Sequence, residues 1–391
     1  MIYLDNAATT KVRRDVLDEM LPYFSEYYTN PSSIYSPSRM VSKKVEEARK
    51  LIAGTIGAEA SEIYFTRGGS ESDNWAIKKI MISRMNKGKH MITTKVEHHA
   101  VLESCKYLES LGFEVTYLNV NEDGLIDLNE LESSIREDTI LVSIMAANNE
   151  IGTLMPLKEI GDICKKYKVL FHTDAVQAYG NIPIDVNEMN IDLLSTSAHK
   201  IEGPKGIGFL YVRKGVMITP LISGGMQEKG KRAGTTNAAG IIGFAKACEL
   251  KFSELEKNNE YVLNLREHLI DRVLSEIPYV RLNGSRQNRL VGNANFSFQF
   301  IEGEGMLLKL DALGICASSG SACTSGSLDP SHVLLAIGLP HEIAHGSLRL
   351  TMNHENTMEE IDYTVDKLKE VISGLRSMSP LYEDFIKKGS N

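Results

Sequence analysis

Ser195-Thr196-Ser197-Ala198-His199-Lys200 is followed directly by Ile201-Glu202-Gly203-Pro204-Lys205-Gly206-Ile207-Gly208. The apolar run 191–194 precedes this stretch, and glycine and proline interrupt the chain after it, so the pattern predicts a buried strand that ends near Lys200. A lysine at the mouth of a buried strand loses solvation, which lowers its amine pKa and lets it form a Schiff base with a carbonyl. A lone lysine is more often an exposed side chain, so the rest of the chain decides between the two interpretations.

The composition is typical of a globular protein with an ordinary core. The chain has 391 residues, of which 42% are hydrophobic and 24% charged, and its net charge is -8. This charge argues against nucleic acid or an anionic membrane as a direct partner, and no apolar run is long enough for a membrane span. The cysteines are odd in number and form no CxxC pair; they are Cys105, Cys164, Cys248, Cys316 and Cys323. We therefore expect a cytoplasmic protein with free thiols and no structural zinc.

Short apolar runs alternate with helical patterns in the first 255 residues. Strands are expected at 63–66, 91–95, 114–120, 139–146, 169–173, 193–197 and 208–212, and helices near 71–87, 98–111, 127–136 and 157–167. Such alternation predicts an α/β fold: a mainly parallel seven-stranded sheet with helices on both faces.

The pattern changes after residue 255. A long helix (255–277), strands at 294–300 and 347–351 and a helix at 357–376 predict a smaller α+β domain, and the tail after 377 is expected to be loose. We expect residues 15–255 to form the large domain, and residues 1–14 with 256–391 to form the small domain.

Two strand ends present candidate binding groups. Residues 66–72 contain Gly69 and Ser70 at the start of a helix, with Ser70 as the expected N-cap, and such a turn can bind a phosphate. An ordinary capped glycine turn fits equally well. Asp174 ends another buried strand, where a carboxylate needs a cation such as the protonated ring nitrogen of a cofactor. The alternative for Asp174 is a helix N-cap.

Three further stretches contain reactive side chains. His98 is able to stack on a flat cofactor and move protons, although a structural histidine is the default interpretation. Cys323 lies in a run of small residues (317–327) that predicts an exposed, mobile loop, and a thiol there suits a nucleophile better than a core residue. Residues 225–231 match GxxxxGK, but Arg232 follows where an NTPase needs Ser or Thr, so only phosphate binding by this basic loop, which continues to Thr235, is retained.

Together these stretches resemble one family over essentially the whole chain, from residue 3 to residue 382. The chain is similar to the cysteine desulfurases of the NifS/IscS type, which are pyridoxal phosphate enzymes of fold-type I. The matching runs are 68–74, 97–98, 148–152, 172–177, 197–200, 232–235 and 319–324.

The resemblance implies a role for each matching residue. Lys200 would hold pyridoxal 5'-phosphate as a Schiff base, Asp174 would pair with its ring nitrogen, and Gln177 would contact its ring hydroxyl. His98 would stack on the ring and move protons. The phosphate would be bound by Gly69, Ser70, Ser197 and His199, together with Thr235 of the neighbouring subunit of a homodimer. Asn149, next to the cofactor, and Arg349 would hold the substrate carboxylate.

The implied reaction converts L-cysteine to L-alanine and leaves a persulfide on Cys323. An acceptor protein, such as an iron–sulfur scaffold or a tRNA-thiolating enzyme, would take the sulfur. No metal site is expected, except that Cys323 is a candidate transient ligand of a cluster. The alternatives are a selenocysteine lyase, an aminotransferase, which needs no thiol, and a non-catalytic sulfur or cluster scaffold.

Two departures from the family pattern stand out. Glu202 replaces a residue that is more often aromatic or small, and it adds a negative charge near Lys200. After Arg349 the family usually has a small polar residue, glycine and arginine, whereas this chain has Leu350-Thr351-Met352-Asn353-His354.

Overall fold

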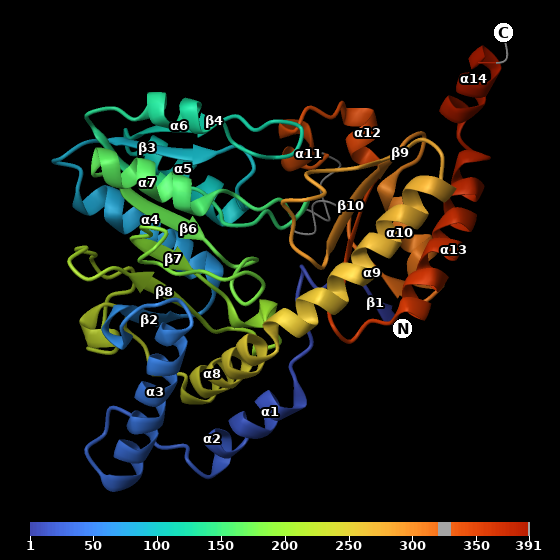
Figure 1. Ribbon diagram of the computed structural model, residues 1–391. Coiled ribbons are helices and arrows are strands. Elements are labelled where there is room, and N and C mark those ends of the chain that lie inside the picture. The colour runs from blue at the N-terminus through green and yellow to red at the C-terminus, as the bar shows by residue number, and fades with distance from the viewer. Residues whose placement is uncertain (320–329, 390–391) are drawn as a thin grey trace.

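The computed structural model describes residues 1–319 and 330–389 (Figure 1). Its main sheet has seven strands in the order β2-β8-β7-β6-β5-β3-β4. Their bounds are β2 Ile63–Thr66, β3 His90–Thr94, β4 Glu114–Leu118, β5 Thr139–Ser143, β6 Leu170–Asp174, β7 Leu193–Ser195 and β8 Gly208–Val212. Strand β8 is antiparallel to both of its neighbours and the other pairs are parallel, so the predicted mainly parallel sheet is confirmed.

Helices cover both faces of this sheet because its strands are apolar on both sides. Leu193 packs into one core with α4 (Gly69–Ser83) and α5 (His99–Ser110), whereas its neighbour Leu194 packs into the core on the opposite face. Successive strand residues point to opposite faces, which explains this alternation. The opposite face is covered by α3 (Ser36–Gly54), α6 (Leu128–Ser134), α7 (Leu157–Tyr167) and α8 (Ala238–Ser253). Two short helices, α1 (Arg14–Met20) and α2 (Pro22–Ser25), precede α3.

A second, three-stranded antiparallel sheet has the order β12-β10-β9. Its strands are β9 Val280–Leu282, β10 Asn293–Phe298 and β12 Ser347–Thr351. A separate hydrophobic core joins it to α9 (Leu255–Glu276), α10 (Gly303–Ala312) and α13 (Met358–Arg376). Leu4 belongs to this core, and β1 (Ile2–Tyr3) pairs with β11 (Ile315–Cys316).

The division into residues 15–255 and 1–14 with 256–391 stays a prediction, which these separate cores support. One group of side chains crosses it: apolar residues from α11 (His332–Ala336) to α12 (His341–His345) pack into the core of the large sheet. They are Val333, Leu334, Ile337, Leu339 and Ala344.

Two local expectations were wrong. Helix α4 begins at Gly69 with Gly68 as its N-cap, so Ser70 lies inside the first turn and does not cap the helix. Residues after 377 form the helix α14 (Pro380–Gly389) where a loose tail was expected. Within the described residues, no helix combines the length and apolar character that crossing a membrane requires.

Candidate active site

A cavity of about 400 Å³ lies where the carboxyl ends of the central strands meet. Ligands of α/β proteins bind at this edge because the loops that follow parallel strands converge there. Ten of the predicted site residues line it: Gly69, Ser70, His98, Asn149, Asp174, Gln177, Ser197, His199, Lys200 and Arg349. Of the other two, Thr235 is exposed and lies away from the cavity lining, and Cys323 lies outside the described residues.

Lys200 ends a short 3-10 turn, Ala198–Lys200, that follows β7. Its Nζ donates hydrogen bonds to the carbonyl oxygens of Ala7 at 2.5 Å and Ala8 at 2.8 Å. Gln177 donates to the same Ala7 carbonyl at 2.9 Å. The N-terminal segment therefore holds the amine at the cavity wall, within reach of a bound carbonyl compound.

Asp174 is the buried last residue of β6. Burial raises the pKa of its carboxyl group, while His98, the Val176 N–H group and Lys200 act in the opposite direction. The Val176 N–H donates to Asp174 Oδ1 at 2.9 Å. A buried carboxylate of this kind is stabilised by a cation that enters the cavity.

His98 caps the N-terminus of α5, and its Nδ1 accepts a hydrogen bond from the Ala100 N–H at 3.1 Å. Because Nδ1 is an acceptor, the proton of the neutral ring lies on Nε2. Burial lowers the pKa of His98 and outweighs the attraction of Asp174. The neutral ring is therefore favoured, and a neutral imidazole is suited to exchanging protons.

The far part of the cavity is a cradle for an anion. It contains the N-terminus of α4, a 15-residue helix whose first N–H groups have no partner within the helix. A Cβ atom at Gly69 would lie 2.5 Å from Val176 Cγ2, and Gly68 has a φ of +142°, so both positions require glycine. Ser197 and His199 line the same space, and burial lowers the pKa of His199 to about 4.

Arg349, on β12, brings a buried cation to the cavity. Its guanidinium donates to the Asn149 carbonyl oxygen and to Asp5 Oδ1, both at 2.9 Å. Its Nε is buried and makes no hydrogen bond to the described residues. A planar guanidinium with an unused donor suits a small carboxylate ligand.

Both described ends of the segment that contains Cys323 lie beside this site. The backbone groups of Ser318 and Arg349 exchange two hydrogen bonds, of 3.2 and 2.6 Å. His332, after the segment, lines the cavity. Since an extended chain advances about 3.3–3.6 Å per residue, the chain between these ends has the length to bring Cys323 to the cavity.

Three further residues line the cavity and were not predicted from the sequence. Asp73 lines the cavity, is buried, and its Oδ1 has no hydrogen-bond partner among the described residues. It lies four residues after Gly69. Because residues i and i+4 lie on the same face of a helix, this spacing could have predicted that Asp73 faces the site. His99 and His332 also line the cavity, with ring centroids 4.9 Å apart. No local pattern in the sequence brings these two rings together.

The residues present fit pyridoxal phosphate. The cavity is of the size that small ligands occupy. It has an acid for a ring nitrogen, an amine for an aldehyde and a helix N-terminus for a phosphate. The unpartnered buried atoms, Asp73 Oδ1 and Arg349 Nε, show that its polar groups are not satisfied by the protein alone.

Known proteins are similar to this chain in sequence and in fold. The family model described as aminotransferase class-V matches residues 2–364. Cysteine desulfurase IscS of Methanosarcina thermophila is 55% identical over 97% of this chain and 94% of its own length. Cysteine desulfurase IscS of Clostridium botulinum is 55% identical over 99% of this chain and 98% of its own length.

Solved structures agree with this result. A NifS-like protein superposes with a TM-score of 0.90 at 40% identity, and the match covers 96% of this chain and 100% of that protein. A NifS-like protein from Rickettsia africae gives a TM-score of 0.87 at 32% identity, covering 95% and 99% of the two chains. The chain thus belongs to the aminotransferase class-V family, whose members have the fold-type I architecture of pyridoxal phosphate enzymes. Within that family it is one of the cysteine desulfurases of the IscS and NifS type.

Proposed function

We propose that this enzyme binds pyridoxal 5'-phosphate through Lys200, converts L-cysteine to L-alanine, and receives the sulfur on Cys323. The observation that supports this most is the single cavity that gathers Lys200, Asp174 and His98 with an anion cradle. When bound, pyridoxal phosphate supplies an aldehyde that condenses with amines and a ring that accepts the electron pair released at the substrate Cα.

The residues around the cavity divide the work of binding. Asp174 stabilises a positive charge on the ring nitrogen, Gln177 contacts the ring hydroxyl, and His98 covers the ring. Arg349 and Asn149 hold the substrate carboxylate, which directs Cα toward Lys200. The phosphate is bound by Gly69, Ser70, Ser197 and His199.

The proton transfers follow from the same geometry. Lys200 would remove the Cα proton of the substrate and later return a proton to the product. The Cys323 thiolate forms a bond to the substrate sulfur while the substrate C–S bond breaks, so the sulfur leaves as a persulfide and the carbon product is alanine. Only the thiolate attacks, and neutral His98 is the group we assign to accept the thiol proton.

We also propose a homodimer in which Thr235 completes the phosphate site of the partner subunit. Thr235 is exposed and is not among the residues that line the cavity of its own chain. Large apolar side chains are exposed on two stretches of the chain, with Tyr28 72%, Ile34 88% and Met226 81% exposed. Burial of these side chains against a partner subunit would support the dimer.

The destination of the sulfur is part of this proposal. A cytoplasmic acceptor protein, either an iron–sulfur scaffold or a tRNA-thiolating enzyme, would take the outer sulfur of the persulfide onto a thiolate of its own, and Cys323 would return to a thiol. A solved structure of SspA in complex with cysteine is 38% identical to this chain with a TM-score of 0.80, and this likeness supports L-cysteine as the substrate here.

The test is product formation from L-cysteine with a thiol reductant, for the wild-type enzyme and Cys323→Ala. We expect equal amounts of alanine and sulfide from the wild type and loss of both in the variant. Absence of alanine from cofactor-loaded wild type would contradict the proposal. Faster alanine formation from selenocysteine in both proteins would favour a selenocysteine lyase, and a protein that stays colourless with pyridoxal phosphate would favour the scaffold.

A further inference from the structure

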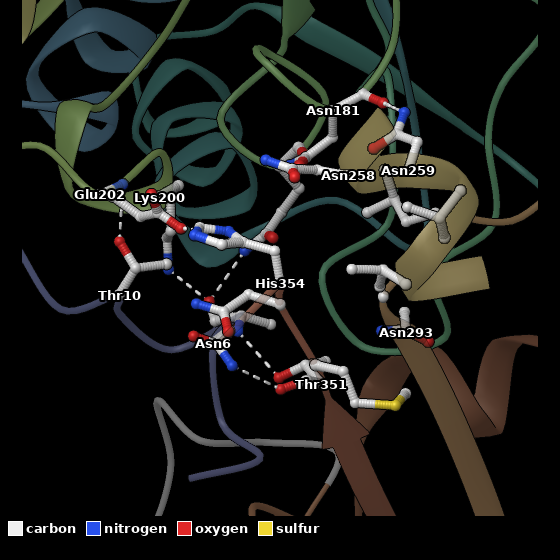
Figure 2. A pocket seen from close by; sticks show the side chains of 18 of the residues that line it. Asn6, Thr10, Asn181, Lys200, Glu202, Asn258, Asn259, Asn293, Thr351 and His354 are labelled. Carbon is white, nitrogen blue, oxygen red and sulfur yellow. Dashed lines mark hydrogen bonds and ion pairs between the residues drawn. The ribbon is translucent and has the colours of Figure 1, made fainter. Parts of the chain in front are cut away.

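A second, smaller cavity of about 70 Å³ shares Lys200, Ala7 and Gln177 with the first (Figure 2). Its other walls come from the junction of α8 and α9 and from the segment after β12. Glu202 and His354 face each other at this cavity (Figure 2). Glu202 is one of the departures from the family pattern noted above and His354 belongs to another, the stretch 350–354, so these two departures meet in one contact.

Glu202 is held in an unfavourable way. It is only 4% exposed, and neither of its carboxylate oxygens makes a hydrogen bond to the described residues. Its φ is +64°, in the left-handed region that long side chains avoid. Such strain persists only where the surroundings impose it, and it is common at functional sites.

Three side chains near the Glu202 carboxylate are cationic or able to become so. His354 Nδ1 lies 3.2 Å from Glu202 Oε1, and Arg13 lies 3.9 Å from Glu202 Oε2. Lys251 faces the same carboxylate, which opposes the lowering of the Lys251 pKa by burial. Arg13 is already paired with Glu254 at 2.7 Å, so His354 is the nearest partner of Glu202.

Hydrogen bonds and an ion pair show how the region around Glu202 and His354 is connected. Residues 5–13 run between the turn that contains Lys200 and the strand that contains Arg349. On one side Lys200 donates to Ala7 and Ala8, and the Glu202 N–H donates to Thr10 Oγ1 at 2.8 Å. On the other side Asp5 pairs with Arg349.

The Glu202–His354 contact joins the two sides directly, without the intervening segment. Glu202 lies two residues after Lys200, and His354 lies five residues after Arg349 on the chain that leaves β12. A change in this contact therefore changes the separation of the groups assigned to the Cα proton and to the substrate carboxylate.

We propose that Glu202 and His354 are positioning residues that set the distance between Lys200 and Arg349, so that an amino acid bound by its carboxylate presents Cα to the lysine. This inference rests on the proposed roles of Lys200 and Arg349. It predicts that loss of the pair impairs proton removal more than substrate binding, because Arg349 itself stays in place.

The experiment measures kcat and KM for L-cysteine, per bound cofactor, in Glu202→Gln, His354→Ala and the double variant. We expect kcat to fall about tenfold in each single variant and no further in the double variant, since the two residues act as one unit, with KM changed less than about twofold. His354→Asn keeps a donor near the position of Nδ1 and should recover most of the rate. The cofactor absorbance band should be the same in all of them.

A matched control comes from the neighbouring exposed ion pair. Lys11 and Glu355 are 3.2 Å apart and connect the 5–13 segment to the same chain after β12, but they are 75% and 51% exposed. Because exposed pairs contribute little, Lys11→Ala and Glu355→Ala should change kcat by less than about twofold.

Two results would overturn the inference. The first is a kcat per bound cofactor in Glu202→Gln equal to that of the wild type. The second is a fall in kcat in the double variant that equals the product of the falls in the two single variants. If Glu202→Gln does not fold, His354→Ala and its rescue by His354→Asn decide, because that side chain is partly exposed. Lys200→Ala and Arg349→Ala distinguish a failure of the proposed function from a failure of the positioning pair. Full activity in those variants would contradict the proposed roles, whereas their failure beside an active Glu202→Gln would contradict only the positioning pair.

Discussion

Asp73 and Asp174 place two buried carboxyl groups together: an oxygen of each lies within 4.8 Å of the other and of a ring nitrogen of His98. Burial raises the pKa of both, and for Asp73 the neighbouring Asp174 raises it further, to well above the ordinary value. Like charges this close do not both ionise in a dry site. Asp73 is therefore the member that holds a proton, and Asp174 is the member left to pair with a ring nitrogen.

This pair predicts unequal effects of two similar substitutions. Asp174→Asn removes the carboxylate, so the dissociation constant of pyridoxal phosphate should rise roughly 10- to 100-fold, as loss of a charged hydrogen bond implies. Asp73→Asn replaces a neutral acid by a neutral amide and should change the constant by less than about threefold. Titration of each apoprotein, followed by cofactor absorbance, measures both. Equal weakening would mean that Asp73 is ionised.

Glu97 should make stability depend on pH. It is buried next to His98, and burial raises its pKa to about 8, against hydrogen bonds from Met145 and Thr94. Between its unfolded-state pKa near 4.5 and this value the native state holds one more proton than the unfolded state. The contribution of Glu97 is thus fully present below pH 4.5 and is lost as the pH rises toward 8, by about 1.4 kcal/mol per pH unit.

Thermal or denaturant unfolding between pH 5 and 8 tests this sign. Glu97→Gln lacks the titrating group. The free energy of unfolding of this variant, relative to that of the wild type, should therefore increase as the pH rises. Glu122→Gln, at an exposed position, is the control and should follow the wild type. A wild-type advantage that grows with pH would contradict the prediction.

The position of Thr235 predicts complementation between two inactive subunits. A mixed dimer of Lys200→Ala and Thr235→Ala contains one complete site if Thr235 acts on the partner, and we expect about half the wild-type activity per dimer. If Thr235 acted within its own chain, each site would lack one residue, and the mixed dimer would be no more active than its Thr235→Ala parent. Differently tagged subunits, purified as the mixed dimer, allow the measurement.

The ion pair between Arg49 and Glu228 should contribute to stability. Its atoms approach to 2.6 Å with side chains only 6% and 8% exposed, and Glu228 also accepts the Phe65 N–H at 3.0 Å. Glu228→Ala removes the buried carboxylate from this guanidinium, which keeps Glu46 at 3.1 Å and the Ile63 carbonyl at 2.9 Å, and should reduce the free energy of unfolding by about 3 kcal/mol. The exposed pair Lys106–Glu103 is the comparison, and Glu103→Ala should cost less than about 1 kcal/mol. Equal losses in chemical unfolding would contradict the assignment.

Much of the large sheet could be predicted from the sequence because its strands are marked locally. The strands 63–66 and 208–212 were predicted with the bounds that the structure gives them, since each is apolar and followed or preceded by glycine. The N-cap of the helix that starts at Gly69 was placed two residues too late, at Ser70, because Gly68 adopts a φ that no pattern of side chains reveals. The helix Pro380–Gly389 was missed because its apolar side chains are few and largely exposed.

By itself the sequence determined the order of the strands along the chain, the family, and ten of the residues that line the cavity. Those features depend on residue type and local spacing, which are written in the chain. Only the tertiary structure decided that Asp73 lies against Asp174, that His99 meets His332, and that Glu202 meets His354. These contacts join residues that lie 101 to 233 positions apart in the sequence. Charge states follow from burial and neighbours, so they emerge only once distant segments pack together.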